Sequence, residues 1–161
     1  EKMRLLNPEL AGGSILDIWV YPISFFHLIQ KARVKTIEAT ATFTKTGVDA
    51  SCDIHITNEL KAKIHIQSSI DEDLSNNAKL VYEKGTIEMI DFSRAITVYI
   101  NKTKFDIPYE GEGFVHQIRS FSESIQRGET ENYIMTFNAS MRCMKTMDEV
   151  RRQIGLKYPL E

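Results

Sequence analysis

VDASCDIHIT, residues 48–57, is the stretch that decides the fold. Its apolar residues alternate strictly with polar ones, and this period of two is typical of a β-strand with one buried and one solvated face. The same alternation runs through residues 37–44 before it and residues 60–67 after it. Asn58 and Glu59 lie between the last two runs and predict a tight hairpin turn. These residues therefore predict a half-buried antiparallel meander.

On either side of this meander the pattern predicts further strands and three helices. An apolar run predicts a helix from Ser14 to about Gln30. Helical stripes run from Phe114 to Ile125, before Gly128, and from Phe137 to Ile154, before Gly155. Shorter strands are expected at residues 79–82, 86–90, 96–100 and 104–107. The fold class is therefore α+β, with a single open, mainly antiparallel mixed sheet and helices packed on one face.

Length and composition predict one domain over residues 1–161, since no linker, repeat or low-complexity tract interrupts the chain. A net charge of −2 gives no electrostatic footprint for nucleic acid. The apolar run 15–29 contains Asp17, Pro22 and His27 and is expected to be too short and too polar to span a bilayer. Two distant cysteines indicate reduced thiols, and the expected location is cytoplasmic.

Asp17 and Tyr21 are the candidate catalytic residues. They are four positions apart, so on a helix they share one face, and Pro22 follows at once with a built-in irregularity. In the functional interpretation the carboxylate orients a substrate hydroxyl while the phenol exchanges a proton, which needs a nearby cation because a phenol ordinarily has a pKa near 10. In the structural alternative, Asp17 completes a capping box with Ser14 and Tyr21 is an amphipathic core residue.

Other motifs predict no cofactor or metal site in this chain. Gly111-Glu112-Gly113 looks like the start of a dinucleotide fingerprint, but His116 replaces the third glycine, so a strand-to-helix turn is expected. The methionines at 141, 144 and 147 are expected to fill the core. The histidines lack mutual ligand spacing, and two cross-strand histidines without a carboxylate do not predict zinc. These histidines are His27, His55, His65 and His116.

Motifs at both ends of the chain resemble those of one enzyme family. NPELAGG, residues 7–13, with DIWVYP, residues 17–22, resembles the opening of the C-terminal domain of the glucose–fructose oxidoreductase / inositol dehydrogenase / MocA (Gfo/Idh/MocA) family. MDEVRRQIGLKYP, residues 147–159, resembles the tail of that domain, and Gly111-x-Gly113-Phe114 resembles the entry to its penultimate helix. The Tyr-Pro pair is similar to the branch of dimeric dihydrodiol dehydrogenase and NADP-dependent xylose dehydrogenase.

The resemblance implies half of an active site. It implies that Asp17 orients the substrate and that Tyr21 acts in proton transfer with a lysine of a Glu-Lys-Pro motif. That lysine, and the NAD or NADP cofactor, would belong to an N-terminal Rossmann domain absent from this chain. Trp19 stands where the family usually has glycine, so its ring is expected to alter the substrate's shape or to close the site.

The expected function is the substrate-binding and dimerisation half of an NAD(P)-dependent oxidoreductase acting on a sugar, polyol or diol CH–OH group. The chain alone is expected to be inactive and to bind no cofactor. Its partners would be a small carbohydrate or diol and a second copy, joined through the open sheet face, with no nucleic acid or membrane. The alternative is a non-catalytic, self-associating module that has kept the sheet.

Overall fold

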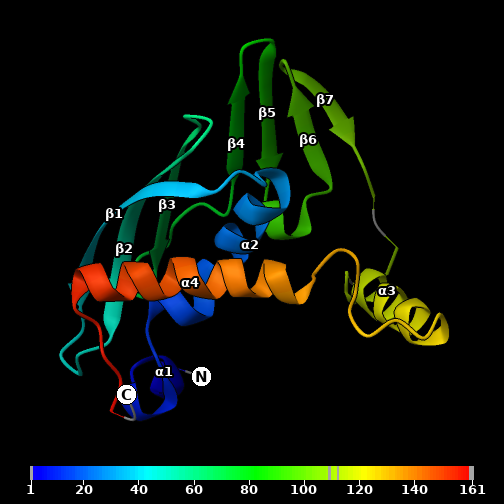
Figure 1. Ribbon diagram of the computed structural model, residues 1–161. Helices are drawn as coiled ribbons and strands as arrows, with labels where there is room; N and C mark the ends of the chain where they lie inside the picture. Colours follow the sequence, from blue (N-terminus) through cyan, green and yellow to red (C-terminus); the bar gives the residue numbers. More distant parts are fainter. Residues whose placement is uncertain (1, 109, 112, 160–161) are drawn as a thin grey trace. The chain divides into compact units, whose positions relative to one another are not determined.

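The chain has an α+β architecture in which antiparallel sheets are combined with helices (Figure 1). The computed structural model describes every residue except 1, 109, 112, 160 and 161. The chain divides into two compact units, Glu1–Leu74 with Met135–Glu161 and Ser75–Ile134. We describe each unit by itself.

The first unit is built on a sheet of β1 (Val34–Phe43), β2 (Asp49–Asn58) and β3 (Lys63–Ser69), paired antiparallel in chain order. The predicted meander is confirmed, with Ile56 opposite both Ile37 and Ile64. Because side chains alternate between the faces of a strand, this register places the isoleucines on one face and the polar residues on the other.

The turn between β2 and β3 is longer than predicted. Leu60 was expected to begin the third strand, but it lies in the connection and is 75% exposed. Asn58 closes this connection with two hydrogen bonds to Ala62. Its Oδ1 accepts from the Ala62 backbone amide at 2.9 Å, and its backbone amide donates to the Ala62 carbonyl. Lys61 takes a positive φ of 63° at the tip, which a strand residue would not adopt.

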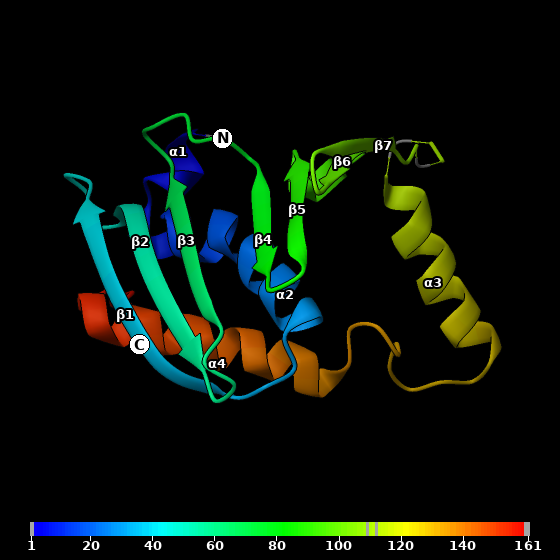
Figure 2. The same cartoon turned by 90° about the horizontal axis from the view of Figure 1, so that it is seen from above.

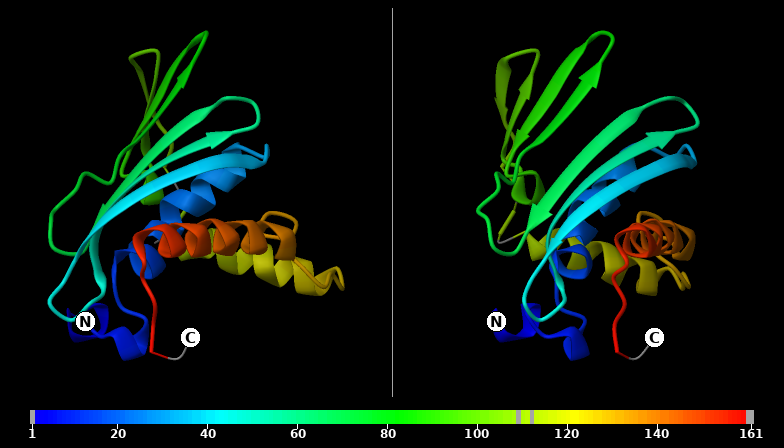
Figure 3. Two further views of the ribbon diagram at one scale, coloured as in Figure 1. Left: turned by 60° about the vertical axis from the view of Figure 1, so that its left-hand side comes forward. Right: turned by 90° about the vertical axis from the view of Figure 1, so that its left-hand side faces the viewer.

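Helices cover the apolar face of this sheet. A π-helix over Ile15–Trp19 leads directly into α2 (Val20–Ile29), and α4 (Phe137–Ile154) packs against α2 and β1. Figure 2 shows the three strands on one side and α2 and α4 together behind them, and Figure 3 shows α4 crossing beneath the strands. The buried apolar side chains that form one cluster are Ile15, Trp19, Ile23, Phe26, Val48, Cys52, Ile54, Ile56, Ile66, Cys143, Met147, Val150, Leu156 and Tyr158.

Residues 8–29 are more apolar than the sequence analysis judged. By length and composition alone, Pro8–Ile29 reaches the threshold for crossing a membrane, with a mean hydropathy of 1.2. In the structure part of this segment is buried, and Trp19 and Ile23 lie in the core of the unit.

The buried face of α4 differs from the predicted stripe. Met147 and Val150 are buried as predicted, but Met141 and Met144 are 53% and 45% exposed, so their assignment to the core was wrong. Cys143 is buried instead. Cys143, Met147 and Val150 mark the buried face. Each step of three residues falls about 60° short of a full turn, so Met144 and then Met141 lie progressively further from this face.

The second unit holds the remaining strands. They are β4 (Ala78–Tyr82), β5 (Gly85–Ile90), β6 (Thr97–Ile100) and β7 (Thr103–Asp106), followed by α3 (Phe114–Gln126). These strands pair antiparallel in chain order as a sheet of their own. The strands thus form two sheets instead of the single one expected, because among the described residues β1–β3 pair with one another and β4–β7 pair with one another.

Candidate functional site

Asp17 and Tyr21 lie on the accessible side of the helix that packs on the sheet. The buried residues Ile15, Trp19 and Ile23 follow at intervals of four and mark the core side. Asp17 and Tyr21 fall between them, with the Asp17 side chain 33% exposed and Tyr21 62% exposed. The structure therefore does not bury Tyr21 as a core residue. The catalytic role of both residues stays a prediction.

The predicted irregularity is a π-helical turn that ends three residues before Pro22. Pro22 has no N–H to donate to the carbonyl four residues earlier, and its ring crowds that carbonyl in a regular α-helix. The wider turn over Ile15–Trp19 relieves this crowding before α2 begins at Val20. The sequence therefore indicated the location of the irregularity, although the helix continues beyond the proline.

Arg4 of α1 (Lys2–Leu5) supplies a cation to this site that the sequence analysis did not identify. Its Nη2 donates to Oδ1 of Asp17 and forms an ion pair. The two residues are 13 positions apart and α1 lies outside the predicted elements, so spacing could not reveal the pair. The Asp17 carboxylate is thus already engaged on one oxygen.

The capping box between Ser14 and Asp17 was wrong. Ser14 makes no side-chain capping bond, and its Oγ lies 2.6 Å from Ser68 Oγ of β3. The helix start is capped from the sheet, since Asp49 Oδ2 accepts from the backbone amides of Ser14 at 2.8 Å and Ile15 at 2.7 Å. A carboxylate at a helix N-terminus satisfies amides that have no partner within the helix.

Asp49 is fully buried at the start of β2. Burial raises the pKa of its carboxyl group, and the amides of Ile15 and Ser14 and the thiol of Cys52 act in the opposite direction. Burial, together with the neighbouring carboxylate, raises the pKa of the Cys52 thiol well above its ordinary value. Cys52 is therefore an inert thiol that donates to Asp49 Oδ2 at 3.6 Å.

The two glycines before the helix are explained by this buried carboxylate. A Cβ on Gly13, whose φ is +109°, would lie 2.0 Å from Asp49 Oδ1, and a Cβ on Gly12 would lie 2.5 Å from the Leu5 carbonyl. The Gly12 carbonyl also accepts the buried hydroxyl of Tyr158 at 2.7 Å. The motifs at the two ends of the chain therefore meet in one contact.

Trp19 does not obstruct the accessible face. Its side chain is 0% exposed and lies in the core. The expectation that this ring would alter the substrate's shape or close the site was therefore wrong, because the ring does not reach the face that carries Asp17 and Tyr21. Because Trp19 is two positions from both Asp17 and Tyr21, a helix places it on the opposite side.

Three groups meet on the polar face of the first sheet. His55 and His65 are register partners on β2 and β3, and their rings stack with centroids 4.3 Å apart and planes 1° apart. His65 Nε2 lies 3.0 and 3.1 Å from the carboxylate oxygens of Asp53, and His55 Nε2 lies 3.2 Å from Oδ1. Gln67 Nε2 donates to Asp53 Oδ2 at 2.7 Å. We call Asp53, His55 and His65 the strand cluster.

The strand cluster corrects the sequence analysis, which placed no carboxylate beside these histidines. Asp53 is two residues before His55 on the same strand, so both side chains leave the same face. Burial raises the pKa of Asp53, but the hydrogen bonds from His65 and Gln67 and the imidazole charges outweigh it and hold the pKa below its usual value. The carboxylate therefore favours its charged form.

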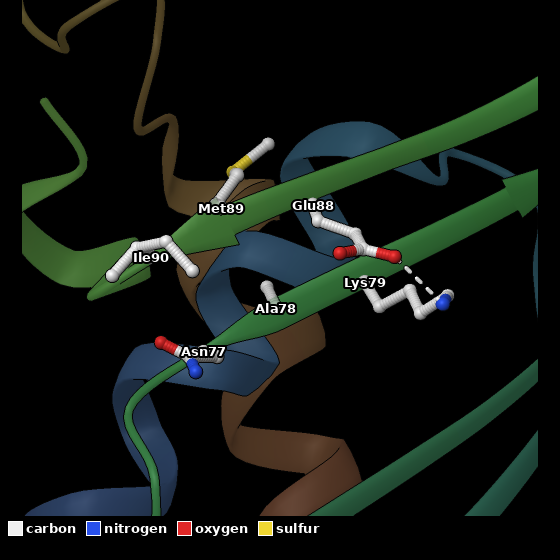
Figure 4. Close-up of a pocket in the computed structure, with 6 residues that line it drawn as sticks. All are labelled: Asn77, Ala78, Lys79, Glu88, Met89 and Ile90. Atoms are coloured by element: carbon white, nitrogen blue, oxygen red, sulfur yellow. Dashed lines mark ion pairs between the residues drawn. The ribbon is translucent and has the colours of Figure 1, made fainter. Parts of the chain in front are cut away.

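Both units also contain a shallow hollow. One of about 450 Å³ lies on the first sheet beside the strand cluster and is lined by residues that include Thr40, Asp53, Gln67 and Glu72. In the second unit Asn77–Lys79 and Glu88–Ile90 line a smaller hollow of about 210 Å³ (Figure 4). Lys79 and Glu88 form an ion pair of 2.7 Å across it.

His27 is buried between α2 and α4. Its Nε2 lies 3.0 Å from Thr146 Oγ1, and the Thr146 hydroxyl donates to the Arg142 carbonyl. We therefore assign the proton of the imidazole to Nε2, which leaves Nδ1 buried without a partner among the described residues. Burial, and to a smaller extent the positive charge of Arg142, lowers the pKa of His27 to about 4.

The glycine pair before α3 does not fit a dinucleotide. Gly113 precedes Phe114 with a φ of 87°, and Gly111 has a φ of 63°. His116 occupies the position that a fingerprint reserves for glycine, and its Cβ prevents the close approach that the third glycine permits. Glu112, the middle residue of the motif, lies outside the described residues.

Comparison with known proteins identifies the family. The model of the GFO/IDH/MocA C-terminal domain matches residues 1–88, more than half of the chain. The chain belongs to the Gfo/Idh/MocA family. The predicted resemblance is therefore confirmed.

Relatives in this family are dehydrogenases. A trans-1,2-dihydrobenzene-1,2-diol dehydrogenase of Xenopus tropicalis is 28% identical over 97% of this chain and 51% of that enzyme. An NADP(+)-dependent scyllo-inositol 2-dehydrogenase of Bacillus subtilis is 25% identical over 99% of this chain and 49% of that enzyme. An NADP(+)-dependent D-xylose 1-dehydrogenase of Hypocrea jecorina is 25% identical over 97% of this chain and 47% of that enzyme. The chain spans about half the length of the curated relatives it matches.

Solved structures share the fold. A 3-ketoreductase of Actinomadura kijaniata, in complex with NADP and TDP-benzene, superposes with a TM-score of 0.81 at 21% identity, over 92% of this chain and 48% of that one. An aldose-aldose oxidoreductase of Caulobacter crescentus gives a TM-score of 0.77 at 17% identity, over 92% and 47%. At these identities the likeness supports the α+β fold alone.

Proposed function

We propose that this chain forms the substrate-binding and self-associating half of a cytoplasmic NAD(P)-dependent oxidoreductase that acts on a CH–OH group of a sugar, polyol or diol. The relatives named above act on a diol, an inositol and a pentose, and two of their names specify NADP(+). The observation that carries the proposal is that Asp17 and Tyr21 are accessible on a helix whose opposite face is anchored in the core.

In this function Asp17 and Tyr21 act on the substrate hydroxyls. The carboxylate of Asp17 accepts a hydrogen bond from a hydroxyl and orients the carbon to be oxidised. Arg4 already binds Oδ1 of this carboxylate, so the substrate uses the other oxygen or replaces Arg4. The phenol of Tyr21 exchanges the proton of the reacting hydroxyl.

The remaining half of the chemistry is proposed to come from outside residues 1–161. The described glycine pair before α3 does not fit a dinucleotide, so we assign the cofactor to a Rossmann domain preceding this chain. A bound nicotinamide supplies the hydride acceptor. A lysine of that domain is proposed to act with the phenol in the proton transfer, since Arg4 is engaged in an ion pair with Asp17.

The polar face of the first sheet is the proposed surface for a second copy. One row of residues paired across the three strands is Thr40, Asp53 and Gln67. A second row is Thr42, Ser51 and Ser69. Such a surface supports a wet, hydrogen-bonded interface with a polar composition. Sedimentation velocity tests this part, because a monomer at all concentrations would contradict it.

A non-catalytic, self-associating module is the competing function. The bulk of Trp19 was the main reason for considering it, and this reason fails because the ring is buried in the core. The sheet face is equally available in both functions, so self-association alone does not distinguish them. Turnover of substrate distinguishes them, because only the oxidoreductase has it.

The test is turnover of the full-length protein with NADP(+) and a panel of D-xylose, scyllo-inositol and trans-1,2-dihydrobenzene-1,2-diol. Tyr21→Phe removes the phenolic proton and is expected to lower kcat by about 10²- to 10⁴-fold, the usual contribution of general acid–base catalysis. Asp17→Asn is expected to raise KM as well as lower kcat.

Tyr133→Phe is the matched control, since Tyr133 is 71% exposed in the other unit. It is expected to leave turnover unchanged. Full activity of the Tyr21→Phe enzyme, or no activity of the unaltered protein on any polyol with either NAD or NADP, would overturn the proposed function.

A further inference from the structure

The strand cluster has the composition of a metal site. We propose that Asp53, His55 and His65 bind one divalent transition-metal ion, with Zn²⁺ the best match among common ions. The three ligand atoms lie within 4.8 Å of one another, and all three side chains are accessible to solvent. This proposal does not depend on the oxidoreductase function.

The spacing of the donor atoms supports the site, and binding would tilt the two stacked rings so that both nitrogens point at one ion. The Nε2 atoms of both histidines approach the same oxygen of Asp53, at 3.2 Å from His55 and 3.0 Å from His65. In a tetrahedral zinc site, bonds of about 2.0–2.1 Å place neighbouring ligand atoms roughly 3.4 Å apart. The two N···O separations are therefore within a few tenths of an ångström of the spacing that zinc requires.

The sheet holds the ligands in place. Asp53 and His55 are alternate residues of β2, and His65 is the direct register partner of His55 on β3. The backbone pairing therefore fixes the relative positions of all three residues. Gln67, the register partner of Asp53, donates to Oδ2 at 2.7 Å and leaves Oδ1 directed at the histidines. A second contact of this kind orients a ligating carboxylate in metal sites.

The donor set indicates which ions fit. Two imidazole nitrogens and one carboxylate suit Zn²⁺, Ni²⁺, Co²⁺ or Fe²⁺, whereas Ca²⁺ and Mg²⁺ prefer oxygen ligands alone. Three protein ligands leave at least one coordination position open. In the single chain the histidines are exposed, so water or a ligand in solution has access to that position, whereas the second copy proposed for this sheet face would cover the same side chains.

The competing explanation is that the carboxylate only hydrogen-bonds two stacked imidazoles. It predicts that the cluster takes up no metal, or takes it up as weakly as any exposed histidine. His116 on α3 provides the comparison, because it is an exposed histidine in the other unit. A His116→Gln variant removes an imidazole without touching the strand cluster.

The experiment is a titration of the EDTA-stripped protein with Zn²⁺ by calorimetry and with Co²⁺ by visible absorption. We expect one equivalent to bind per chain and the Co²⁺ complex to show d–d bands. His65→Gln and Asp53→Asn are each expected to weaken binding by at least about tenfold, comparable to or larger than losses seen on removing outer-shell contacts. His116→Gln is expected to bind as the parent does.

Two results would overturn the site. One is the absence of saturable uptake by the parent protein. The other is an equal loss of affinity in His116→Gln and His65→Gln, which would indicate binding by exposed histidines in general. Far-UV circular dichroism of each variant shows that any loss of binding comes from the ligand and not from unfolding, because the substituted side chains lie on the solvated face.

Discussion

The two units of the chain contrast in how they use apolar residues. The unit with β1–β3 holds all the buried apolar side chains of the described residues, whereas in residues 75–134 the buried side chain is that of Ser124. On α3, Phe114, Ile118 and Phe121 are each more than 60% exposed. The first unit is therefore stabilised by apolar burial and the second mainly by local strand pairing. The candidate residues Asp17, Tyr21 and Asp53 all lie on the packed unit.

The largest expected difference between the units concerns two glycines with positive φ. Gly13→Ala brings a Cβ to 2.0 Å from Asp49 Oδ1 at a φ of +109°, whereas a Cβ on Gly128 in the second unit meets nothing within 4 Å. Gly13→Ala is expected to cost about 3–5 kcal/mol, the sum of backbone strain and overpacking. Urea unfolding followed by the fluorescence of Trp19, the single tryptophan, measures this loss.

Gly128→Ala, with a φ of +70°, is the control. Because Trp19 belongs to the first unit, its unfolding midpoint is expected to stay unchanged in this variant. Equal shifts in both variants would show that the units share one core, and the contrast drawn above would fail.

The next largest effect is the pH dependence of the first unit through His27. Its pKa is about 4 in the folded chain against an ordinary value of 6.5, so between these values the unfolded chain binds a proton that the folded chain does not. The stability is therefore complete above pH 6.5 and falls as the pH approaches 4. The shift corresponds to about 3 kcal/mol. Unfolding free energies measured from pH 7.5 to pH 4 test this loss.

His27→Gln is expected to flatten this part of the pH profile, because the amide cannot be protonated in this range. His116→Gln is expected to keep the full slope, since His116 is exposed on α3. A slope that persists in His27→Gln would assign the proton uptake to another group.

The smallest effect concerns the contact between the two end motifs. Tyr158→Phe removes the hydroxyl that donates to the Gly12 carbonyl at 2.7 Å and keeps the ring beside Arg151. Because the carbonyl loses its buried donor, the variant is expected to lose about 1–2 kcal/mol. The matched variant Tyr133→Phe, at a 71% exposed position, is expected to change the thermal midpoint by less than one degree. Indistinguishable midpoints for the two variants would count against the contact.

The sequence predicted the parts of this fold that depend on local periodicity. Alternation located β1–β3 and their pairing, and the interval of four placed Asp17 and Tyr21 together on the accessible side of the helix. It misplaced Leu60 because an alternating pattern continues through a turn without a visible change. It also put Met141 in the core, since a stripe drawn in steps of three residues drifts around the helix by about 60° per step.

The contacts that define the site join residues distant in the chain. Asp49 caps a helix that begins 34 residues earlier, and Arg4 reaches Asp17 from a separate helix. The cross-strand pair of His55 and His65 was visible in the sequence, but Asp53 was overlooked. Because Asp53 is two residues before His55 on the same strand, the alternation alone would have placed its carboxylate beside the two histidines.

The π-helical turn over Ile15–Trp19 sets the rotational phase of everything that follows it. Its start is fixed because Asp49 binds the amides of Ser14 and Ile15, and its continuation is fixed because Ile23 is buried. Each residue of an α-helix turns the chain by about 100°, so deleting one residue of the wide turn would rotate Tyr21 away from its present side or pull Ile23 out of the core. The number of residues in the first turn thus decides which side of the helix carries Asp17 and Tyr21. A relative whose first turn is α-helical would present other residues on that side.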